Sequence, residues 1–336
     1  MIDKNEPAAE MDITPEYRDQ DSNLGILKTP ASLPIPRPSS ESEPTLNLPS
    51  NSQATNIRDT WMWTYRNVGS LKITETILPG THNSGFDKEA PYTPSGDTCQ
   101  DVSTLKQLLG GIRVLDLRVQ FFGGLGSGDA RRFSIFHSTT SGRTVQEILQ
   151  NILTFHQANR SKEIIIVNFH QFKNFTTAAH TELASLIKNA FSQSAYRSKL
   201  ITPNLKSMTI NNIWQRNLNE NVVIAYNTSN RDSAFWPGVN QRWIGENTPS
   251  TAKLKSFMDR VAQESKPQDE LRSIQCAKYS LPFHVPKNLS GDINTWFKAG
   301  ESKNAYIQKF FIINTDWSLR SNLVDDCIYA NYVKTR

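Results

Sequence analysis

The sequence contains few cysteines and no long apolar run. Its 336 residues include three cysteines, Cys99, Cys276 and Cys327, whose number and spacing form neither a disulfide framework nor a C-x-x-C metal pair. No stretch of about 18 apolar residues is present, so the sequence predicts no membrane-spanning helix. The first residues, Met1 to Pro7, also lack the apolar segment of a secretory signal peptide. These absences favour a cytoplasmic protein; secretion stays open if the N-terminus is not the one given.

Aromatic side chains are nearly missing from the start of the chain. Residues 1–57 contain no Trp or Phe and one Tyr, Tyr17, yet they hold 8 of the 17 prolines. Such a segment buries too little apolar area to offset the conformational entropy that is lost on ordering. Its stretch 29–52 is rich in Pro and Ser, which favours extended conformations. We therefore predict a disordered arm over residues 1–57 and one folded domain over residues 58–336.

Charge is divided unevenly between these two parts. Residues 1–57 carry 4 Lys/Arg and 9 Asp/Glu, a net charge of −5, whereas the whole chain carries +5. The folded part therefore has a net charge of +10, which suits an anionic membrane surface or a phosphorylated substrate. Lys/Arg runs and repeated aromatic–basic patterns are absent, so the sequence does not predict nucleic-acid binding. We expect a peripheral membrane protein; the sequence does not indicate its oligomeric state.

Glycine-rich phosphate loops are absent as well. Neither G-x-G-x-x-G nor G-x-x-x-x-G-K occurs, which disfavours a doubly wound nucleotide-binding sheet. Eight segments rich in β-branched or aromatic residues read as strands, and several are continuously apolar, as strands buried on both faces are. They cover residues 73–78, 112–119, 133–137, 163–172, 222–226, 242–244, 273–280 and 309–315. Eight strands with helices between them predict an α/β barrel.

Helix signals lie between these segments. Thr144-Val-Gln-Glu147 matches a capping box and is followed by apolar residues at helical spacing. Asp101 is placed to cap a second helix, which ends at Gly110-Gly111. A third helix is expected over residues 177–191. The alternation of strands and helices agrees with the barrel.

Polar side chains gather where the predicted strands end. His82 follows the first strand, Asp116 and Arg118 lie in the second, and His137 ends the third. Active-site groups of barrel enzymes lie at the C-terminal strand ends, and residues two apart in a strand face the same side. Two imidazoles can act as base and acid while a guanidinium neutralises phosphoryl oxygens. Each residue alone has a structural explanation, but together they favour phosphodiester cleavage.

Six ordered motifs resemble the X domain of phosphatidylinositol-specific phospholipases C, and most closely the short animal X-domain-only proteins. They are LPGTHNSG (78–85), GIRVLDLRV (111–119), FSIFHST (133–139), EIIIVNFHQF (163–172), NVVIAYN…FWPG…W (221–243) and IINTDW (312–317). The resemblance implies a distorted TIM-type barrel that cleaves phosphatidylinositol-type lipids. The inositol 2-hydroxyl would attack its own phosphodiester, releasing diacylglycerol and a cyclic inositol phosphate.

The resemblance also implies a role for each residue of the site. His82 looks like the general base and His137 like the general acid. Arg118 resembles the group that steadies the pentacovalent phosphoryl transition state. Asp116 is similar to the carboxylate that orders the arginine and nearby polar groups, and Asp316 to the late carboxylate that orients the base.

Calcium dependence divides the family that the chain resembles, and the second predicted strand bears on it. Calcium-dependent members place two acidic residues there, where this chain has Asp116 and Arg118. Calcium requires oxygen ligands with negative charge, and an arginine repels it. We therefore predict no metal and no cofactor, with a calcium-dependent phosphodiesterase of the same fold as an alternative.

The residue after the predicted base departs from the metal-independent pattern. Those members commonly have Asp at this place, whereas this chain has Asn83, and an amide cannot supply a negative charge. A catalytically weak module that binds phosphoinositides or membranes is therefore a second alternative. Substrate contacts are expected from Asn83, Asn168, His170 and Tyr226.

Overall fold

The computed structural model describes residues 57–157, 160–192 and 198–336. The predicted arm lies outside these residues except for Ile57, so both the arm and the predicted domain boundary stay predictions. The strands are β1 (Leu78–Thr81), β2 (Val114–Phe121), β3 (Phe133–Phe136), β4 (Thr140–Thr144), β5 (Ile165–Lys173), β6 (Lys199–Leu200), β7 (Glu220–Tyr226), β8 (Trp236–Pro237), β9 (Asn240–Arg242), β10 (Arg272–Cys276), β11 (Tyr279–Ser280), β12 (Val285–Pro286) and β13 (Ile312–Thr315).

Parallel pairing joins most of these strands into one curved sheet. Its order is β6-β7-β5-β2-β1-β13-β10-β9, with β8 paired to β7. The first and last strands of the domain, β1 and β13, are neighbours through pairs such as Gly80 with Asn314. No ladder joins β8 to β9 within the described residues, and only Gly238 and Val239 connect them along the chain. The sheet is therefore a distorted barrel, as predicted.

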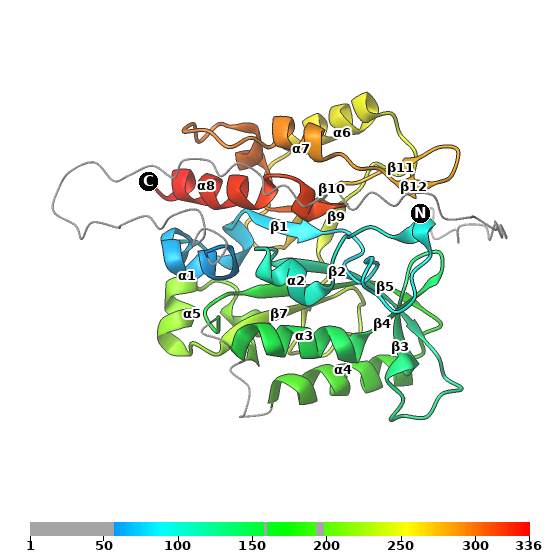
Figure 1. Cartoon of the computed structure of the whole chain (residues 1–336). Coiled ribbons are helices and arrows are strands. Elements are labelled where there is room, and N and C mark those ends of the chain that lie inside the picture. Colours follow the sequence, from blue (N-terminus) through cyan, green and yellow to red (C-terminus); the bar gives the residue numbers. More distant parts are fainter. Residues whose placement is uncertain (1–56, 158–159, 193–197) are drawn as a thin grey trace, which may run out of the picture.

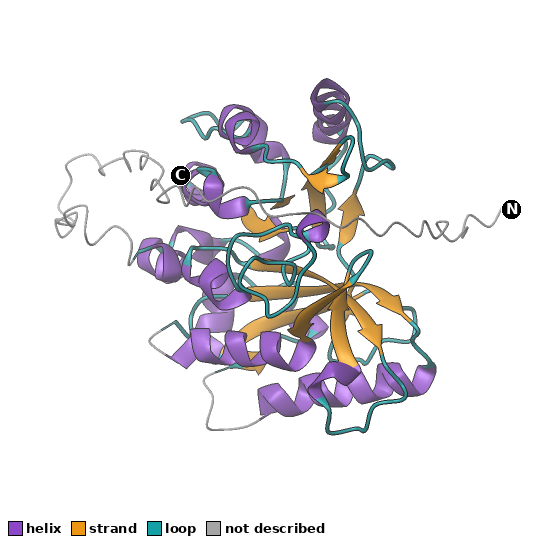
Figure 2. Ribbon diagram, turned by 45° about the vertical axis from the view of Figure 1, so that its right-hand side comes forward, coloured by secondary structure: helices purple, strands orange, loops and turns teal. Residues whose placement is uncertain are grey.

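Helices surround the strands on the outside (Figures 1 and 2). They are α1 (Trp61–Tyr65), α2 (Thr104–Leu109), α3 (Val145–Gln157), α4 (Thr177–Ser192), α5 (Ile210–Arg216), α6 (Thr251–Gln263), α7 (Ser290–Trp296) and α8 (Leu323–Thr335). The apolar run 164–167 in and before β5 is wholly buried, as expected for a strand covered on both faces. No helix of the described residues is long and apolar enough to cross a bilayer, and all three cysteines are free and buried.

A buried ion pair fastens the start of the domain to the barrel. Arg113, just before β2, donates to Oε2 of Glu163 at 2.7 Å, and both side chains are fully buried. The same guanidinium donates to the carbonyl oxygen of Asp59 at 2.9 Å. Glu163 accepts from the backbone N–H groups of Met62 and Trp63 at 3.1 and 2.9 Å. Because the remaining polar atoms of the pair are also bonded, this contact avoids an uncompensated buried charge.

Three local predictions differ from the structure. Residues 73–75 form a short 3-10 helix, and the first strand begins only at Leu78. The predicted third barrel strand, β3, instead pairs antiparallel with β2 and with β4, so it forms a ribbon beside the barrel. Asp101 does not cap α2, because its carboxylate binds Arg320 at 2.5 and 2.6 Å. By contrast, the Thr144 hydroxyl accepts from the Glu147 N–H at 3.2 Å, which is one of the two bonds of a capping box, while the Glu147 carboxylate binds Arg143.

Candidate active site

His82 is held at the mouth of the barrel by the loop that follows β1. Its backbone N–H donates to the carbonyl oxygen of Thr315 at 3.1 Å, and its carbonyl accepts from the Gln100 amide at 2.9 Å. The close approach of β1 to β13 requires a glycine, since a Cβ on Gly80 would lie 2.0 Å from Oδ1 of Asn314. The motif before His82 thus fixes the place of the imidazole.

The ring of His82 is paired with a buried carboxylate. Its Nδ1 lies 2.8 Å from Oδ1 of Asp316, which follows β13. A carboxylate accepts, so the neutral ring carries its proton on Nδ1 and keeps Nε2 as a free base. Asp316 also stabilises the imidazolium that would form when Nε2 takes up a proton.

His137 is paired with a different carboxylate, that of Asp97. Its Nδ1 lies 3.2 Å from Oδ1 of Asp97, at the end of a 3-10 turn over Ser95–Asp97. The same carboxylate accepts from the hydroxyls of Ser138 at 2.5 Å and Thr139 at 2.6 Å. Burial acts to raise the pKa of Asp97, but the hydrogen bonds from His137, Ser138 and Thr139 lower it to about 2. Asp97 is therefore ionised at neutral pH.

The two histidines face each other across the mouth. Their ring centroids are 6.4 Å apart and their planes meet at 84°. Burial lowers the pKa of His137, and the nearby charge of Arg118 adds to this effect, while Asp97 opposes it. The hydroxyl of Tyr279 lies 3.2 Å from Nε2 of His137. His82 thus keeps Nε2 as a basic nitrogen, whereas Nε2 of His137 lies beside the Tyr279 hydroxyl.

Asp116 forms the polar centre of the site on β2. Its Oδ1 accepts from the amides of Asn168 at 2.9 Å and Gln241 at 2.7 Å, and lies 3.6 Å from Nδ1 of His170. The side chain is fully buried. Burial acts to raise the pKa of Asp116, but His170 and, more weakly, His82 and Arg118 lower it to about 2. The carboxylate is ionised and held in one orientation.

Several buried polar atoms at this mouth have no hydrogen-bond partner within the described residues. They are Nε of Arg118, Nδ1 of His170, Oδ2 of Asp116, Oδ2 of Asp316 and Oδ1 of Asn83. An unpaired buried polar group costs about 1–3 kcal/mol, so such a cluster is unfavourable unless something else binds it. The set contains a cationic donor and several acceptors, which suits an anionic ligand that carries hydroxyl groups.

The structure brings together eight of the nine predicted residues, and Tyr226 is the exception. The Tyr226 hydroxyl lies 2.9 Å from Nδ1 of His180 on α4, and its ring packs 4.6 Å from that of Phe172. In the β5–β7 register Tyr226 pairs with Phe169, whereas Asn168 pairs with Ala225. Because neighbouring residues in a strand point to opposite faces, Tyr226 points away from the face that carries Asn168. The structure therefore does not bring Tyr226 to the mouth with the other eight residues.

Asn168 lies in the site, but both ends of its amide are bonded. It donates to Asp116 and accepts from the N–H of Val239 at 3.2 Å. The geometry thus makes it a support for the Asp116 carboxylate. His170 is partly exposed, so its ring keeps the capacity to contact a substrate, while its buried Nδ1 lies 3.6 Å from Oδ1 of Asp116.

Four residues of the site were not predicted from the sequence: Asp97, Cys99, Gln241 and Tyr279. Asp97 lies in a loop 40 residues before His137, and no periodic pattern links them. Gln241 is the middle residue of β9 and lies inside the motif that spans 221–243, and that motif was the available signal.

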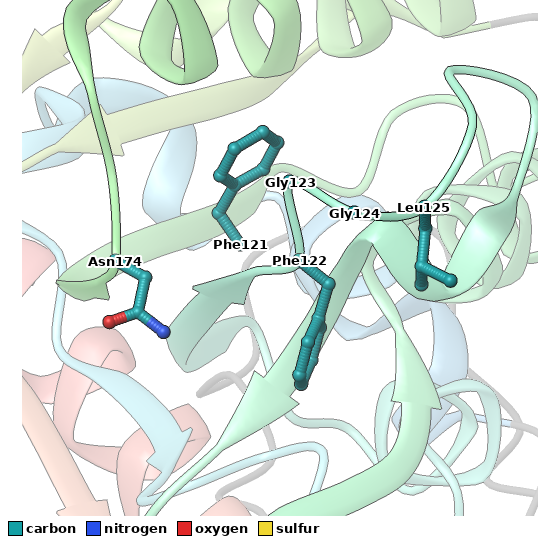
Figure 3. A pocket seen from close by; sticks show the side chains of 6 residues that line it. All are labelled: Phe121, Phe122, Gly123, Gly124, Leu125 and Asn174. Carbon is teal, nitrogen blue, oxygen red and sulfur yellow. The ribbon is translucent and has the colours of Figure 1, made fainter.

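A separate hollow of about 460 Å³ lies beyond the ends of β2 and β5 (Figure 3). It is lined by residues 121–125 and by Asn174, mostly with aromatic rings and glycine backbone. None of these side chains ionises, and none belongs to the paired histidines. The hollow therefore offers no acid–base chemistry of its own.

Comparison with solved structures defines the class of fold. The chain is similar to the phosphatidylinositol-specific phospholipase C from Listeria monocytogenes, with a TM-score of 0.56 and 16% identity over 83% of this chain and 98% of that one. It is also similar to the F249X mutant of phosphatidylinositol-specific phospholipase C from Staphylococcus aureus, with a TM-score of 0.61 and 13% identity over 82% and 98% of the chains. The fold is thus that of phosphatidylinositol-specific phospholipases C.

Curated relatives point to the X-domain proteins of animals. The chain is 25% identical over 221 residues to PI-PLC X domain-containing protein 2 of Homo sapiens, covering 58% of this chain and 68% of the relative. The identity to PI-PLC X domain-containing protein 2 of Mus musculus is 28% over 274 residues, which is 74% of each chain. No family model matches the chain. The predicted resemblance to X-domain proteins is confirmed.

Proposed function

We propose that the chain cleaves phosphatidylinositol-type lipids by attack of the inositol 2-hydroxyl on the adjacent phosphorus. The observation that supports this most is the pairing of each histidine with its own carboxylate, His82 with Asp316 and His137 with Asp97. Two such pairs facing each other across a barrel mouth can remove one proton and deliver another without moving. The products would be diacylglycerol and a cyclic inositol phosphate.

The first half of the reaction requires a base. Nε2 of His82 would accept the proton of the 2-hydroxyl while its Nδ1–H stays bonded to Asp316. The oxygen then bonds to phosphorus, and negative charge builds on the phosphoryl oxygens. Arg118, whose Nε has no partner among the described residues, is a cation on the same strand face as Asp116 and would neutralise that charge.

The second half requires an acid. His137 in its protonated form would give the proton on Nε2 to the leaving diacylglycerol oxygen, which would replace the Tyr279 hydroxyl as the partner of Nε2. Asp97 favours the protonated ring, because its carboxylate is ionised and lies against Nδ1. Asn83 cannot supply this charge, so the Asp97 carboxylate compensates for the departure from the metal-independent pattern.

We infer that this reaction needs no metal at the second strand. Calcium takes six to eight oxygen ligands, usually with several carboxylates. Here Asp116 is the carboxylate on that face of β2, and one of its oxygens already accepts from two amides. Arg118 follows two residues later with a fixed positive charge. Activity that persists in excess chelator supports this, whereas a rate restored only by calcium contradicts it.

The mouth of the barrel carries an apolar rim that suits a lipid surface. Five exposed large apolar residues lie in the segments that follow β1, β9 and β10: Tyr92, Trp243, Leu281, Phe283 and Val285. The last three lie in or beside the β11–β12 hairpin, which projects from the barrel in Figure 1. Insertion of such side chains, assisted by the +10 charge of residues 58–336, would place the site against an anionic membrane.

Product release from vesicles tests the proposed function. Vesicles of phosphatidylinositol, and of phosphatidylcholine as a matched lipid, are incubated with wild type, His82→Ala and His137→Ala, and diacylglycerol is measured. We expect diacylglycerol from phosphatidylinositol with the wild type alone. Vesicle binding without any product, from a chain with folded circular dichroism, would instead favour the catalytically weak binding module.

A further inference from the structure

Cys99 places a thiol beside the predicted base. One ligand atom each of His82, Cys99 and Asp316 lies within 4.8 Å of the others, and all three residues are buried. The sulfur lies 3.6 Å from the Asn83 amide nitrogen and 3.2 Å from the carbonyl oxygen of Asp97. No step of the proposed reaction uses this thiol. The cluster combines one imidazole, one sulfur and one carboxylate.

Two unpaired oxygens add to this cluster. Oδ2 of Asp316 and Oδ1 of Asn83 are both buried and have no hydrogen-bond partner within the described residues. A cation between the three side chains would satisfy the free carboxylate oxygen. A thiolate and an imidazole are ligands of zinc and of similar thiophilic metals, whereas calcium and magnesium select oxygen ligands. The donor set is therefore the wrong one for calcium.

We propose that His82, Cys99 and Asp316 form an inhibitory site for a thiophilic divalent cation such as Zn²⁺. This inference rests on the proposed function for its inhibitory effect. Tetrahedral zinc with bonds of roughly 2.0–2.3 Å holds its ligand atoms about 3.3–3.8 Å apart, so the cluster must contract by about 1 Å. Binding through Nδ1 of His82 releases the thiol proton and moves the Nδ1 proton to Nε2, because a metal-bound histidine is a neutral imidazole. Metal at this imidazole removes the base and its carboxylate partner together.

Cadmium absorption tests the site without reference to activity. Cd²⁺ is added to the full chain, and the ultraviolet cadmium–thiolate band is titrated in wild type, Cys99→Ser and Cys327→Ser. Cys327 is a matched control, because it is equally buried and lies on α8 outside the cluster. We expect one equivalent to bind to wild type and to Cys327→Ser, and no band in Cys99→Ser. A wild type without the band, or a band that survives Cys99→Ser, overturns the proposal.

Zinc inhibition supplies a second and separable readout. In the phosphatidylinositol assay, Zn²⁺ should inhibit the wild type, and a chelator should reverse the inhibition. Inhibition of Cys99→Ser to the same extent should require a zinc concentration about 100-fold higher or more. Circular dichroism checks that each variant is folded. If Cys99→Ser does not fold, Cys99→Ala is used in its place. A cadmium band in a chain without lipase activity would support the metal site and reject the proposed function. Lipase activity without the band would support the proposed function and reject the metal site.

Discussion

Replacement of Asp97 by asparagine should weaken both the general acid and the fold. The carboxylate accepts from Nδ1 of His137, the hydroxyls of Ser138 and Thr139 and the N–H of Thr139. The asparagine side chain has the same shape, but it carries no charge, and its NH₂ group would face donors that the carboxylate now accepts from. The Asp97 side chain is 10% exposed, so water cannot replace these bonds fully.

The magnitude follows from the pKa of Asp97. Its ordinary value of 3.8 is lowered to about 2 in the folded chain. At about 1.4 kcal/mol for each pKa unit, the fold favours the charged form by about 2 kcal/mol. A lowered carboxyl pKa contributes stability that is complete above 3.8 and is lost as the pH falls towards 2. Asp97→Asn should therefore lose about 2 kcal/mol at pH 7 and much less near pH 2.

The pH profile separates the catalytic effect from the structural one. Burial already lowers the pKa of His137, and removal of the Asp97 charge should lower it further. Because the acid must be protonated, the alkaline limb of kcat/KM should move to lower pH by about one unit or more. Ser138→Ala is the matched control, since it removes one bond to the same carboxylate and keeps the charge. An alkaline limb that stays in place in Asp97→Asn would refute this reasoning.

Three further predictions concern the fold, the phosphoryl charge and the membrane. Glu163→Gln leaves the Arg113 charge buried without a counter-ion, so urea unfolding should show a loss of about 3–5 kcal/mol; a loss below 1 kcal/mol contradicts the anchoring role. Arg118→Met should lower kcat by about 10²–10³-fold without reducing vesicle binding, and an unchanged kcat would remove Arg118 from the mechanism. Phe283→Asp should weaken vesicle binding by about tenfold or more in sedimentation assays. The control is Leu218→Asp, which should not weaken binding because Leu218 is exposed before β7, at the other end of the barrel. Equal losses in the two variants would reject the apolar rim as the membrane contact.

The strands and most of the site could be predicted because their signals are local. A continuously apolar run such as 164–167 must be buried on both faces, and a strand end that carries His82 or Asp316 must open at the barrel mouth. The bond from the Glu147 N–H to the Thr144 hydroxyl joins residues three apart, so it too is visible in the sequence.

The remaining features depend on register and on loops. The sequence of β3 is as apolar as a barrel strand, and only its antiparallel pairing with β2 shows that it belongs to a ribbon. Tyr226 was expected among the substrate contacts, because the register that pairs it with Phe169 cannot be read from one strand alone. Asp97 reaches His137 from an irregular turn, where no periodicity constrains the direction of the side chain.

Phosphorus NMR of phosphatidylinositol vesicles, with the purified full chain and excess chelator, tests the central claim most directly. The two-histidine mechanism predicts a cyclic phosphodiester signal that grows with time, survives the chelator and is absent in both His82→Ala and His137→Ala. A folded wild type that yields no cyclic product over hours, or yields it only after calcium is restored, would contradict the account.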